Sequence, residues 1–284
     1  MTIFEYRTKF HEVLSDKYPK EEIDTFFYWL LEAYFKLTKT HVFLNAEHRL
    51  SISEKNQLSE ALKRLSTYEP IQYILGETEF YGLSFRVNPS VLIPRPETEE
   101  LVTLVFNFVK NELNENVKIA DIGTGSGCIA ISVAKQLPQA RVDAYDISSN
   151  ALTIASENAI RNNVNVSFIK ADILKLTALN QTYDVIVSNP PYVCWSEKKL
   201  MTQNVFEYEP EEALFVEDSS PLIFYEKIAA LASHYLNPNG KLFFEINERF
   251  GEAIKTLLSK QNFKDIRIHK DLFGKDRMVS CTLN

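Results

Sequence analysis

The segment Asn189-Pro190-Pro191-Tyr192 places an amide, two prolines and an aromatic ring directly after the apolar run 183–188. Proline has no backbone N–H, and Pro190 restrains the residue before it to an extended conformation, so we expect a stiff loop with outward carbonyl groups. The Asn189 oxygen and a proline carbonyl can accept both N–H bonds of an NH2 group, while Tyr192 covers its face. These residues predict a catalytic site for a planar substrate with an NH2 group.

A glycine-rich segment lies upstream, between the apolar runs 117–120 and 128–134. It reads Asp121-Ile122-Gly123-Thr124-Gly125-Ser126-Gly127. Glycine permits unusual backbone angles and lets a ligand approach the chain closely, so the pattern predicts a strand, a ligand-binding turn and a helix. The glycine spacing differs from the dinucleotide fingerprint, and the Gly-Lys-Ser/Thr of a Walker loop is missing.

Two acids follow the next two apolar stretches. Asp146 ends the stretch 142–146, where its carboxylate can accept hydrogen bonds from both hydroxyls of a ribose. Asp172 follows the stretch 166–171, where it can accept a hydrogen bond from an adenine amine. A glycine turn after one strand, an acid after each of the next two and the amide motif after a fourth form an ordered series. The series predicts a nucleoside-containing cofactor beside the substrate.

With these motifs the chain resembles the Rossmann-like S-adenosylmethionine-dependent methyltransferases, and more closely the HemK/PrmC family of peptide chain release factor glutamine methyltransferases. The resemblance spans nearly the whole chain and is strongest from Pro70 to Tyr192. Its further pieces are Pro70 to Gly76, Phe80 to Val87, Val91 to Glu99, Tyr208-Glu209-Pro210 with Ala213-Leu214, and Asp271 to Arg277. Pro94-Arg95-Pro96-Glu97-Thr98-Glu99 discriminates best, because related ribosomal-protein enzymes differ after Pro-Arg and DNA methyltransferases lack the element.

The resemblance implies an enzyme that uses S-adenosylmethionine to methylate the glutamine amide nitrogen in the Gly-Gly-Gln loop of release factors. The catalytic residues it implies are Asn189, Pro190, Pro191 and Tyr192. The cofactor-binding residues it implies are Asp121, Gly123, Thr124, Gly125, Ser126, Gly127, Asp146, Asp172, Ile173 and Asn189. Two alternative functions are less well supported by the sequence. A DNA amino-methyltransferase lacks support from any obvious target-recognition domain, and a noncatalytic cofactor-binding subunit has no need of the complete motif set.

Four details are open or depart from the family pattern. Where the family often has Glu-x-Gly-x-x-Gln-Gly, the chain carries Asn247 and Phe250 in place of the middle Gly and the Gln. The stretch 215–220 also lacks the glycines that many members have. We expect both stretches, 215–220 and 245–251, to lie outside the cofactor and Asn-Pro-Pro-Tyr contacts. The stretch 195–204 is either a substrate lid or an exposed loop. Trp29 is expected in the core of a helical bundle rather than in a partner groove.

The elements that position these residues follow from apolar spacing. Helical spacing at 4–17, 21–36 and 53–66 predicts a small bundle, and residues 1–70 are expected to form a substrate-recognition domain. Alternation around Gly82 predicts a β-hairpin linker at 71–92. In the catalytic domain 93–284 we expect a helix at 97–112, βα units near 117, 141, 165 and 183, helices at 221–236 and 251–261, and strands at 241–246, 265–270 and 277–283. This order predicts an α/β fold with a seven-stranded, mostly parallel sheet and a ligand at the strands' carboxyl ends.

Charge, cysteine content and hydropathy argue against several other classes of protein. The net charge of −7 argues against a sequence-independent nucleic-acid binder, which needs a cationic surface, so no direct nucleic-acid binding is expected. The cysteines Cys128, Cys194 and Cys281 are odd in number and far apart, which argues against disulfides or a zinc site. No apolar run reaches the ~20 residues of a membrane span. We therefore expect a cytoplasmic protein with no membrane partner and no metal site.

Overall fold

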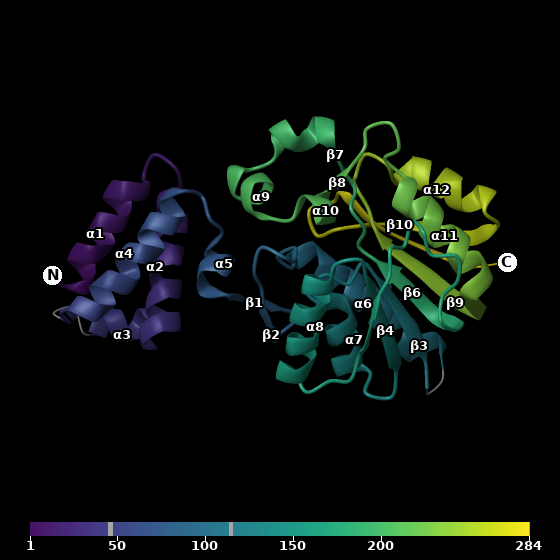
Figure 1. Cartoon of the computed structure of the whole chain (residues 1–284), viewed down its shortest axis with the longest axis horizontal. Coiled ribbons are helices and arrows are strands. Elements are labelled where there is room, and N and C mark those ends of the chain that lie inside the picture. Colours follow the sequence, from purple (N-terminus) through teal and green to yellow (C-terminus); the bar gives the residue numbers. More distant parts are fainter. Residues whose placement is uncertain (45–47, 114–115, 284) are drawn as a thin grey trace. The chain divides into compact units, whose positions relative to one another are not determined.

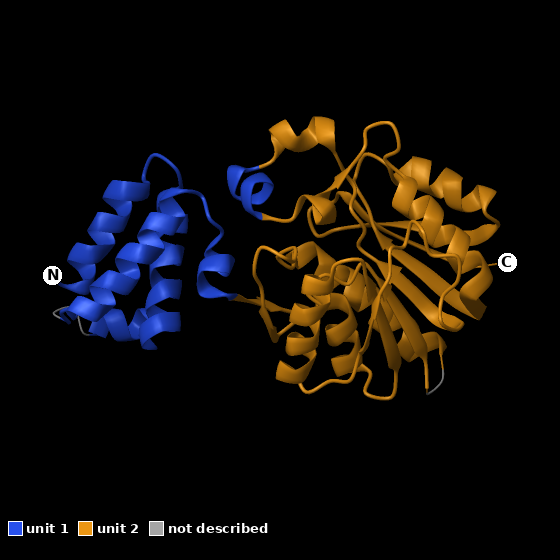
Figure 2. Cartoon of the chain, in the orientation of Figure 1, with its two compact units in different colours: residues 1–76, 202–208 blue, residues 77–201, 209–284 orange. Residues whose placement is uncertain are grey.

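The computed structural model describes residues 1–44, 48–113 and 116–283. The chain forms two compact units (Figure 2). The first unit comprises residues 1–76 and 202–208, and the second comprises residues 77–201 and 209–284. Each unit has its own hydrophobic core, as expected for independently packed parts of a chain.

The first unit is helical (Figure 1). Its helices are α1 (Ile3–Leu14), α2 (Lys20–Phe35), α3 (Lys39–Leu44), α4 (Ile52–Ser66), α5 (Ile71–Leu75) and α9 (Gln203–Tyr208). Thr2 and Ser51 begin α1 and α4 with capping boxes, in which each side chain and the glutamate three residues later exchange hydrogen bonds with the backbone. The predicted helices at 4–17, 21–36 and 53–66 match α1, α2 and α4, whereas α3 is an additional helix.

The predicted hairpin is present but shorter than the range 71–92. Strand β1 (Glu77–Phe80) pairs antiparallel with β2 (Leu83–Arg86) around Tyr81 and Gly82, which both have positive φ angles. The prediction is wrong for Ile71–Leu75, which forms α5. Pro70 begins this helix and Gly76 ends it in the left-handed conformation. Over five residues, a helical turn and a strand show similar apolar spacing, so the pattern alone could not separate them.

Seven strands form one sheet among the described residues of the second unit, in the order β10-β11-β9-β6-β3-β4-β5. They are β3 (Lys118–Ile122), β4 (Arg141–Asp146), β5 (Ser167–Lys170), β6 (Tyr183–Ser188), β9 (Leu236–Glu245), β10 (Phe263–Lys270) and β11 (Asp276–Leu283). The five strands from β9 to β5 are parallel, and β11 runs antiparallel to both of its neighbours. This confirms the predicted seven-stranded, mostly parallel sheet.

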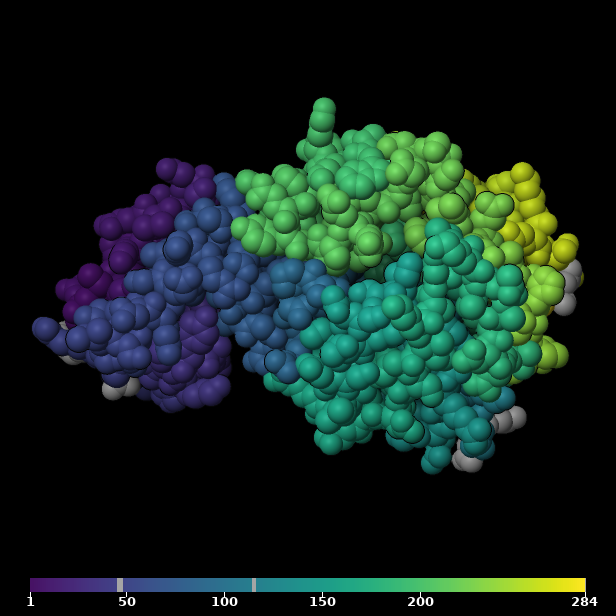
Figure 3. Space-filling model, viewed as in Figure 1, coloured from purple at the N-terminus to yellow at the C-terminus, as the bar shows by residue number. Residues whose placement is uncertain are grey.

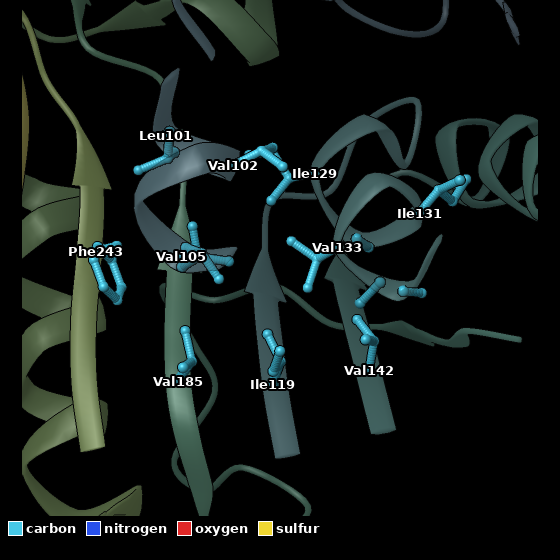
Figure 4. Packing of buried hydrophobic residues seen from close by; sticks show 14 of the residues in the cluster. Leu101, Val102, Val105, Ile119, Ile129, Ile131, Val133, Val142, Val185 and Phe243 are labelled. Atoms are coloured by element: carbon cyan, nitrogen blue, oxygen red, sulfur yellow. The ribbon is translucent and has the colours of Figure 1, made fainter. Parts of the chain in front are cut away.

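Helices cover both faces of the sheet. They are α6 (Pro96–Glu112), α7 (Cys128–Gln136), α8 (Ser149–Arg161), α11 (Ile223–Tyr235) and α12 (Gly251–Lys260). Successive strand residues face opposite sides, so Ile119 and Val185 pack under α6 and α7, while Ala120 and Ile186 pack against α11. Figure 4 shows α6 and α7 over Ile119, Val142 and Val185. Helices α7 and α8 contribute to the teal surface in Figure 3.

The connection from β5 to β6 differs from the predicted βα unit near 165. Residues 171–182, all of them described, contain a turn at 173–175 and no helix. Leu179 is buried in this stretch, and Ala171, Ile173 and Leu176 pack against the core under α11 without forming a helix. No helix in the described ranges has the length and apolar character needed to cross a membrane.

Candidate active site

The sheet register brings the predicted motifs to one edge. Ile122 at the end of β3 pairs with Ser188 of β6 on one side and with Tyr145 of β4 on the other. The Ser188 hydroxyl also donates a hydrogen bond of 2.6 Å to the Ile122 carbonyl. The glycine turn, Asp146 and Asn189 therefore begin at the carboxyl ends of three adjacent strands. Asp172 follows β5, the edge strand beyond β4.

The glycine turn combines tight packing with open space. Gly127 has φ +82°, and a Cβ atom there would lie 2.8 Å from the Ile131 side chain and 3.2 Å from Ala155. A side chain at this position would be strained by the positive φ angle and would crowd Ile131 on α7 and Ala155 on α8. At Gly123 and Gly125, by contrast, an added Cβ would have no atom within 4 Å. The backbone of these two glycines is open to a ligand.

Asp121 is a buried carboxyl group below this turn. Its Oδ2 accepts hydrogen bonds from the Thr124 hydroxyl at 2.6 Å and from the Ala130 N–H at 3.2 Å. Its Oδ1 is buried without a hydrogen-bond partner among the described residues. Burial raises the pKa of Asp121 to about 7, although both hydrogen bonds act to lower it. A buried acceptor in this state fits a site that takes up a donor from a ligand.

Asp146 and Asp172 differ in how firmly they are held. Asp146 accepts hydrogen bonds of 2.8 Å from the Gly125 N–H and the Ser148 N–H, so the glycine turn itself orients the carboxylate. Burial raises the pKa of Asp146. Asp172 is more exposed and forms an ion pair of 2.9 Å with the exposed Lys175, and the hydrogen bond in this pair lowers the pKa of Asp172. The neighbouring Ile173 is half-buried against the core under α11.

The Asn-Pro-Pro-Tyr segment is held at both ends by one buried carboxyl group. Asn189 Nδ2 donates to the Thr98 hydroxyl at 3.3 Å, and that hydroxyl donates to Glu245 Oε2 at 2.7 Å. The Tyr192 hydroxyl donates to Glu245 Oε1 at 3.1 Å. Glu245 is 1% exposed, and burial raises the pKa of its carboxyl group. Between the two ends, Pro190 is buried and Pro191 is half-buried.

Sequence reasoning did not single out Thr98, Glu245 or Glu209 as site residues. A usable signal existed for Glu245, because it ends an apolar strand at the same edge as the other motifs. Glu209 is buried, accepts a hydrogen bond of 3.1 Å from the Ile93 N–H and forms an ion pair with Arg95. Within the Pro-Arg-Pro-Glu-Thr-Glu element, Arg95 is therefore structural and Thr98 reaches the candidate site.

The expectation for Asn247 is wrong. Its Nδ2 donates hydrogen bonds to the Tyr192 carbonyl at 3.3 Å and to Glu197 Oε2 at 3.1 Å, so this departure touches the Asn-Pro-Pro-Tyr segment directly. The reason is the sheet order: β9 lies beside β6, which brings the residues after β9 next to the loop after β6. Phe250, the other departure, packs against the core under α11.

The stretch 195–204 is divided between the two units. Trp195–Leu200 forms the 3-10 helix η1 in the second unit, beside the short paired strands β7 (Val193–Cys194) and β8 (Phe215–Val216) and the helix α10 (Glu211–Leu214). The Trp195 ring stacks on the Phe215 ring, with 4.3 Å between the ring centroids. Glu197 Oε1 forms an ion pair of 2.9 Å with Arg249 Nη1. The first half of the stretch is thus anchored, while residues 202–208 belong to the first unit.

Comparisons with known proteins identify the class to which the chain belongs. Residues 102–214 match the family model "Methyltransferase small domain", and residues 5–76 match "PrmC N-terminal domain". A methyltransferase from Pyrococcus furiosus shares the fold, with a TM-score of 0.52, 21% identity, and coverage of 81% of this chain and 97% of that one. The fold and the two family models together place the chain among the methyltransferases.

Two relatives of known name show to which methyltransferase family the chain belongs. The release factor glutamine methyltransferase of Flavobacterium psychrophilum is 49% identical over 98% of both chains. That of Bacteroides thetaiotaomicron is 44% identical over 94% of this chain and 95% of its own. The chain therefore belongs to the release factor glutamine methyltransferase family.

Proposed function

We propose that the chain transfers a methyl group from S-adenosylmethionine to the side-chain amide nitrogen of the glutamine in the Gly-Gly-Gln motif of peptide chain release factors. The observation that carries the proposal is the position of Asn189, one residue beyond the strand that pairs with the glycine-turn strand. An amide acceptor held there lies beside a ligand bound over the glycines. Membership of the family supports the same substrate.

The residues of the site fit S-adenosylmethionine, which supplies a methyl group activated by a positively charged sulfur. Asp121 Oδ1, which is buried and has no hydrogen-bond partner among the described residues, would accept from the amino group of the methionine part. Gly123 and Gly125 leave room for the ligand along the backbone. Asp146 retains free lone pairs for the ribose hydroxyls, and Asp172 with Ile173 would border the adenine.

The role of the amide grip follows from the chemistry of the acceptor. An amide nitrogen is a poor nucleophile because its lone pair is delocalised into the carbonyl group. Asn189 Oδ1 and the Pro190 carbonyl would accept its two N–H bonds and stabilise the positive charge that develops as the N–C bond forms and the S–C bond breaks. Positioning for this in-line displacement can supply up to ~7–11 kcal/mol. The proton leaves after the transfer, so the mechanism needs no general base.

The affinity for S-adenosylmethionine should rise with pH between about 6 and 7.5, by up to about tenfold, because the ionised form of Asp121 pairs with the ligand's amino group. Burial raises the pKa of Asp121 to about 7, so this carboxyl group is largely protonated at the lower end of the range. The rise should level off where the ligand's amino group loses its proton, near ~7.7–8.0. Isothermal titration calorimetry measures the Kd at each pH.

The Asp121→Asn variant serves as the control for this titration. It should bind S-adenosylmethionine more weakly and with little dependence on pH, because the amide does not ionise. A flat profile for the unaltered protein would show that Asp121 does not pair with the ligand.

The first unit offers a surface for recognising the release factor. A groove of about 380 Å³ on this unit is lined by Glu21, Glu22 and Trp29, together with Pro70 and Asn204. Trp29 is 45% exposed, so the expectation that it lies in the bundle core is wrong. An exposed tryptophan beside two carboxylates suits a basic side chain of a protein partner. We therefore assign release factor recognition to this groove.

Replacing Trp29 with alanine should raise the KM for a full-length release factor by about tenfold and leave kcat unchanged. A short peptide with the Gly-Gly-Gln sequence lacks the rest of the release factor, so its KM should not change. Steady-state methylation of both substrates measures the difference. Ile52→Ala, which removes another exposed apolar side chain of the first unit, is the matched control. Equal effects of Trp29→Ala on both substrates would rule out the groove.

The proposed function is tested by methyl transfer from labelled S-adenosylmethionine. A release factor, its variant with alanine in place of the loop glutamine, and duplex DNA are offered in parallel. We expect label on the intact release factor alone, which would identify both the activity and its site. Label on DNA, or on the alanine variant at the same level, would overturn the proposal.

A further inference from the structure

We propose that Thr98 and Glu245 are positioning residues that fix the rotation of the Asn189 amide, so that its oxygen and not its nitrogen faces the methyl acceptor. The identity of the acceptor rests on the proposed function. The rotation of the amide is a property of this chain alone and can be tested without any substrate.

The direction of each hydrogen bond determines the rotation. The Thr98 hydroxyl has a single proton, and it donates this proton to Glu245 Oε2 at 2.7 Å. Thr98 can then only accept from Asn189, which must present its NH2 group, and Nδ2 lies at 3.3 Å from the hydroxyl oxygen. Because the oxygen and nitrogen of an amide lie on opposite sides, Asn189 Oδ1 points away from Thr98.

Burial raises the pKa of the Glu245 carboxyl group, and the groups around it act in both directions. Burial favours the protonated carboxyl group, whereas the hydrogen bonds from Thr98 and Tyr192 and the positive charge of Arg277 on β11 favour the ionised one. Glu97 on α6 opposes ionisation. The hydroxyl of Tyr225 on α11 donates to the backbone carbonyl of Glu245 at 3.1 Å and leaves the carboxylate oxygens to Thr98 and Tyr192.

The same carboxylate holds both ends of the Asn-Pro-Pro-Tyr segment. Its Oε2 reaches Asn189 through Thr98, and its Oε1 accepts directly from the Tyr192 hydroxyl at 3.1 Å. An outward Asn189 oxygen accepts from the NH2 group of a glutamine but repels the carboxylate of a glutamate. The network therefore sets the preference for an amide over a carboxylate as well as the rate.

The substitution Glu245→Gln tests the direction of the network with a side chain of the same shape. A glutamine can donate to the Thr98 hydroxyl, which frees the Thr98 proton for the Asn189 oxygen and lets the amide turn over. Thr98→Val removes the hydroxyl, and Thr98→Ser keeps it as the control. In the first two variants we expect kcat to fall about 100-fold while the KM for S-adenosylmethionine stays within about threefold. Thr98→Ser should retain kcat within about threefold.

A second substrate separates positioning from a merely structural role. Binding of a release factor with glutamate in place of the loop glutamine is compared with binding of the unaltered factor. In Glu245→Gln and Thr98→Val, the preference for glutamine should fall about tenfold, because a turned Asn189 donates to the carboxylate. Thr98→Ser should keep the preference. An unchanged preference in all three variants, whatever happens to kcat, would overturn the inference.

Nuclear magnetic resonance of the free protein makes the test independent of the substrate. With labelled asparagine, and the Asn189→Ala variant to assign the signal, the side-chain NH2 protons of Asn189 should show cross-peaks to the Thr98 side chain. These cross-peaks should weaken in Glu245→Gln and persist to the serine in Thr98→Ser. If the unaltered protein shows them but methylates no release factor, the proposed function fails and the inference stands. Their absence from the unaltered protein would overturn the inference.

Discussion

Replacing Asn189 with alanine should lower kcat for release factor methylation by about 10³-fold and leave the Kd for S-adenosylmethionine within about threefold. The substitution removes one of the two acceptors that would hold the substrate NH2 group, and this interaction strengthens as the nitrogen becomes positive. The glycine turn and Asp146 keep their own contacts in the variant. Single-turnover methylation measures the chemical step, and calorimetry measures binding of the methyl donor.

Asn247→Ala is the matched control for this experiment. It also removes an asparagine that contacts the Asn-Pro-Pro-Tyr segment, through the Tyr192 carbonyl, but it supplies no acceptor to the substrate. We expect kcat to fall by less than about tenfold, because only the support of the loop is weakened. A kcat for Asn189→Ala as high as that of the control would show that the amide grip is not the source of catalysis.

The parts of the fold that the sequence predicted are those with strong local patterns. Strands β3 and β6 are continuous apolar runs because both of their faces are buried, with Ile119 and Val185 on one face and Ala120 and Ile186 on the other. The expectation for Trp29 was wrong, although Trp29 falls outside the face of α2 that buries Phe27, Leu30 and Leu31. Another error lies in the short element Ile71–Leu75, where caps at Pro70 and Gly76 decide the structure rather than periodicity.

In the candidate site, too, some residues could be predicted from local sequence and others could not. The glycine turn, Asp146 and Asn189 each follow their own strand, so local sequence was enough to bring them to one edge of a parallel sheet. The link from Asn189 to Thr98 spans 91 residues, and that from Thr98 to Glu245 spans 147. These contacts depend on β9 lying beside β6. The local sequence of a strand does not determine which strand lies next to it in the sheet.

Replacing Asp146 with alanine should raise the Kd for S-adenosylmethionine by about 10²-fold or more. Two hydrogen bonds from ribose hydroxyls to a carboxylate would be lost, each worth roughly 1.5–3 kcal/mol. The glycine turn would also lose the acceptor that now holds the Gly125 N–H. Thermal unfolding of the ligand-free variant shows how much of the loss comes from the turn, and calorimetry gives the change in Kd.

Asp172→Asn provides the comparison that makes this result specific. Asp172 already pairs with Lys175 and accepts from the Leu174 N–H at 3.1 Å, so a ligand must compete with groups that the chain itself supplies. Its replacement should raise the Kd by less than about tenfold, since an adenine amine offers one hydrogen bond and the asparagine oxygen can still accept it. A larger effect at Asp172 than at Asp146 would reverse the two assignments. The ribose would then lie beyond β5, and the contact between Asp146 and Gly125 would serve only to shape the turn.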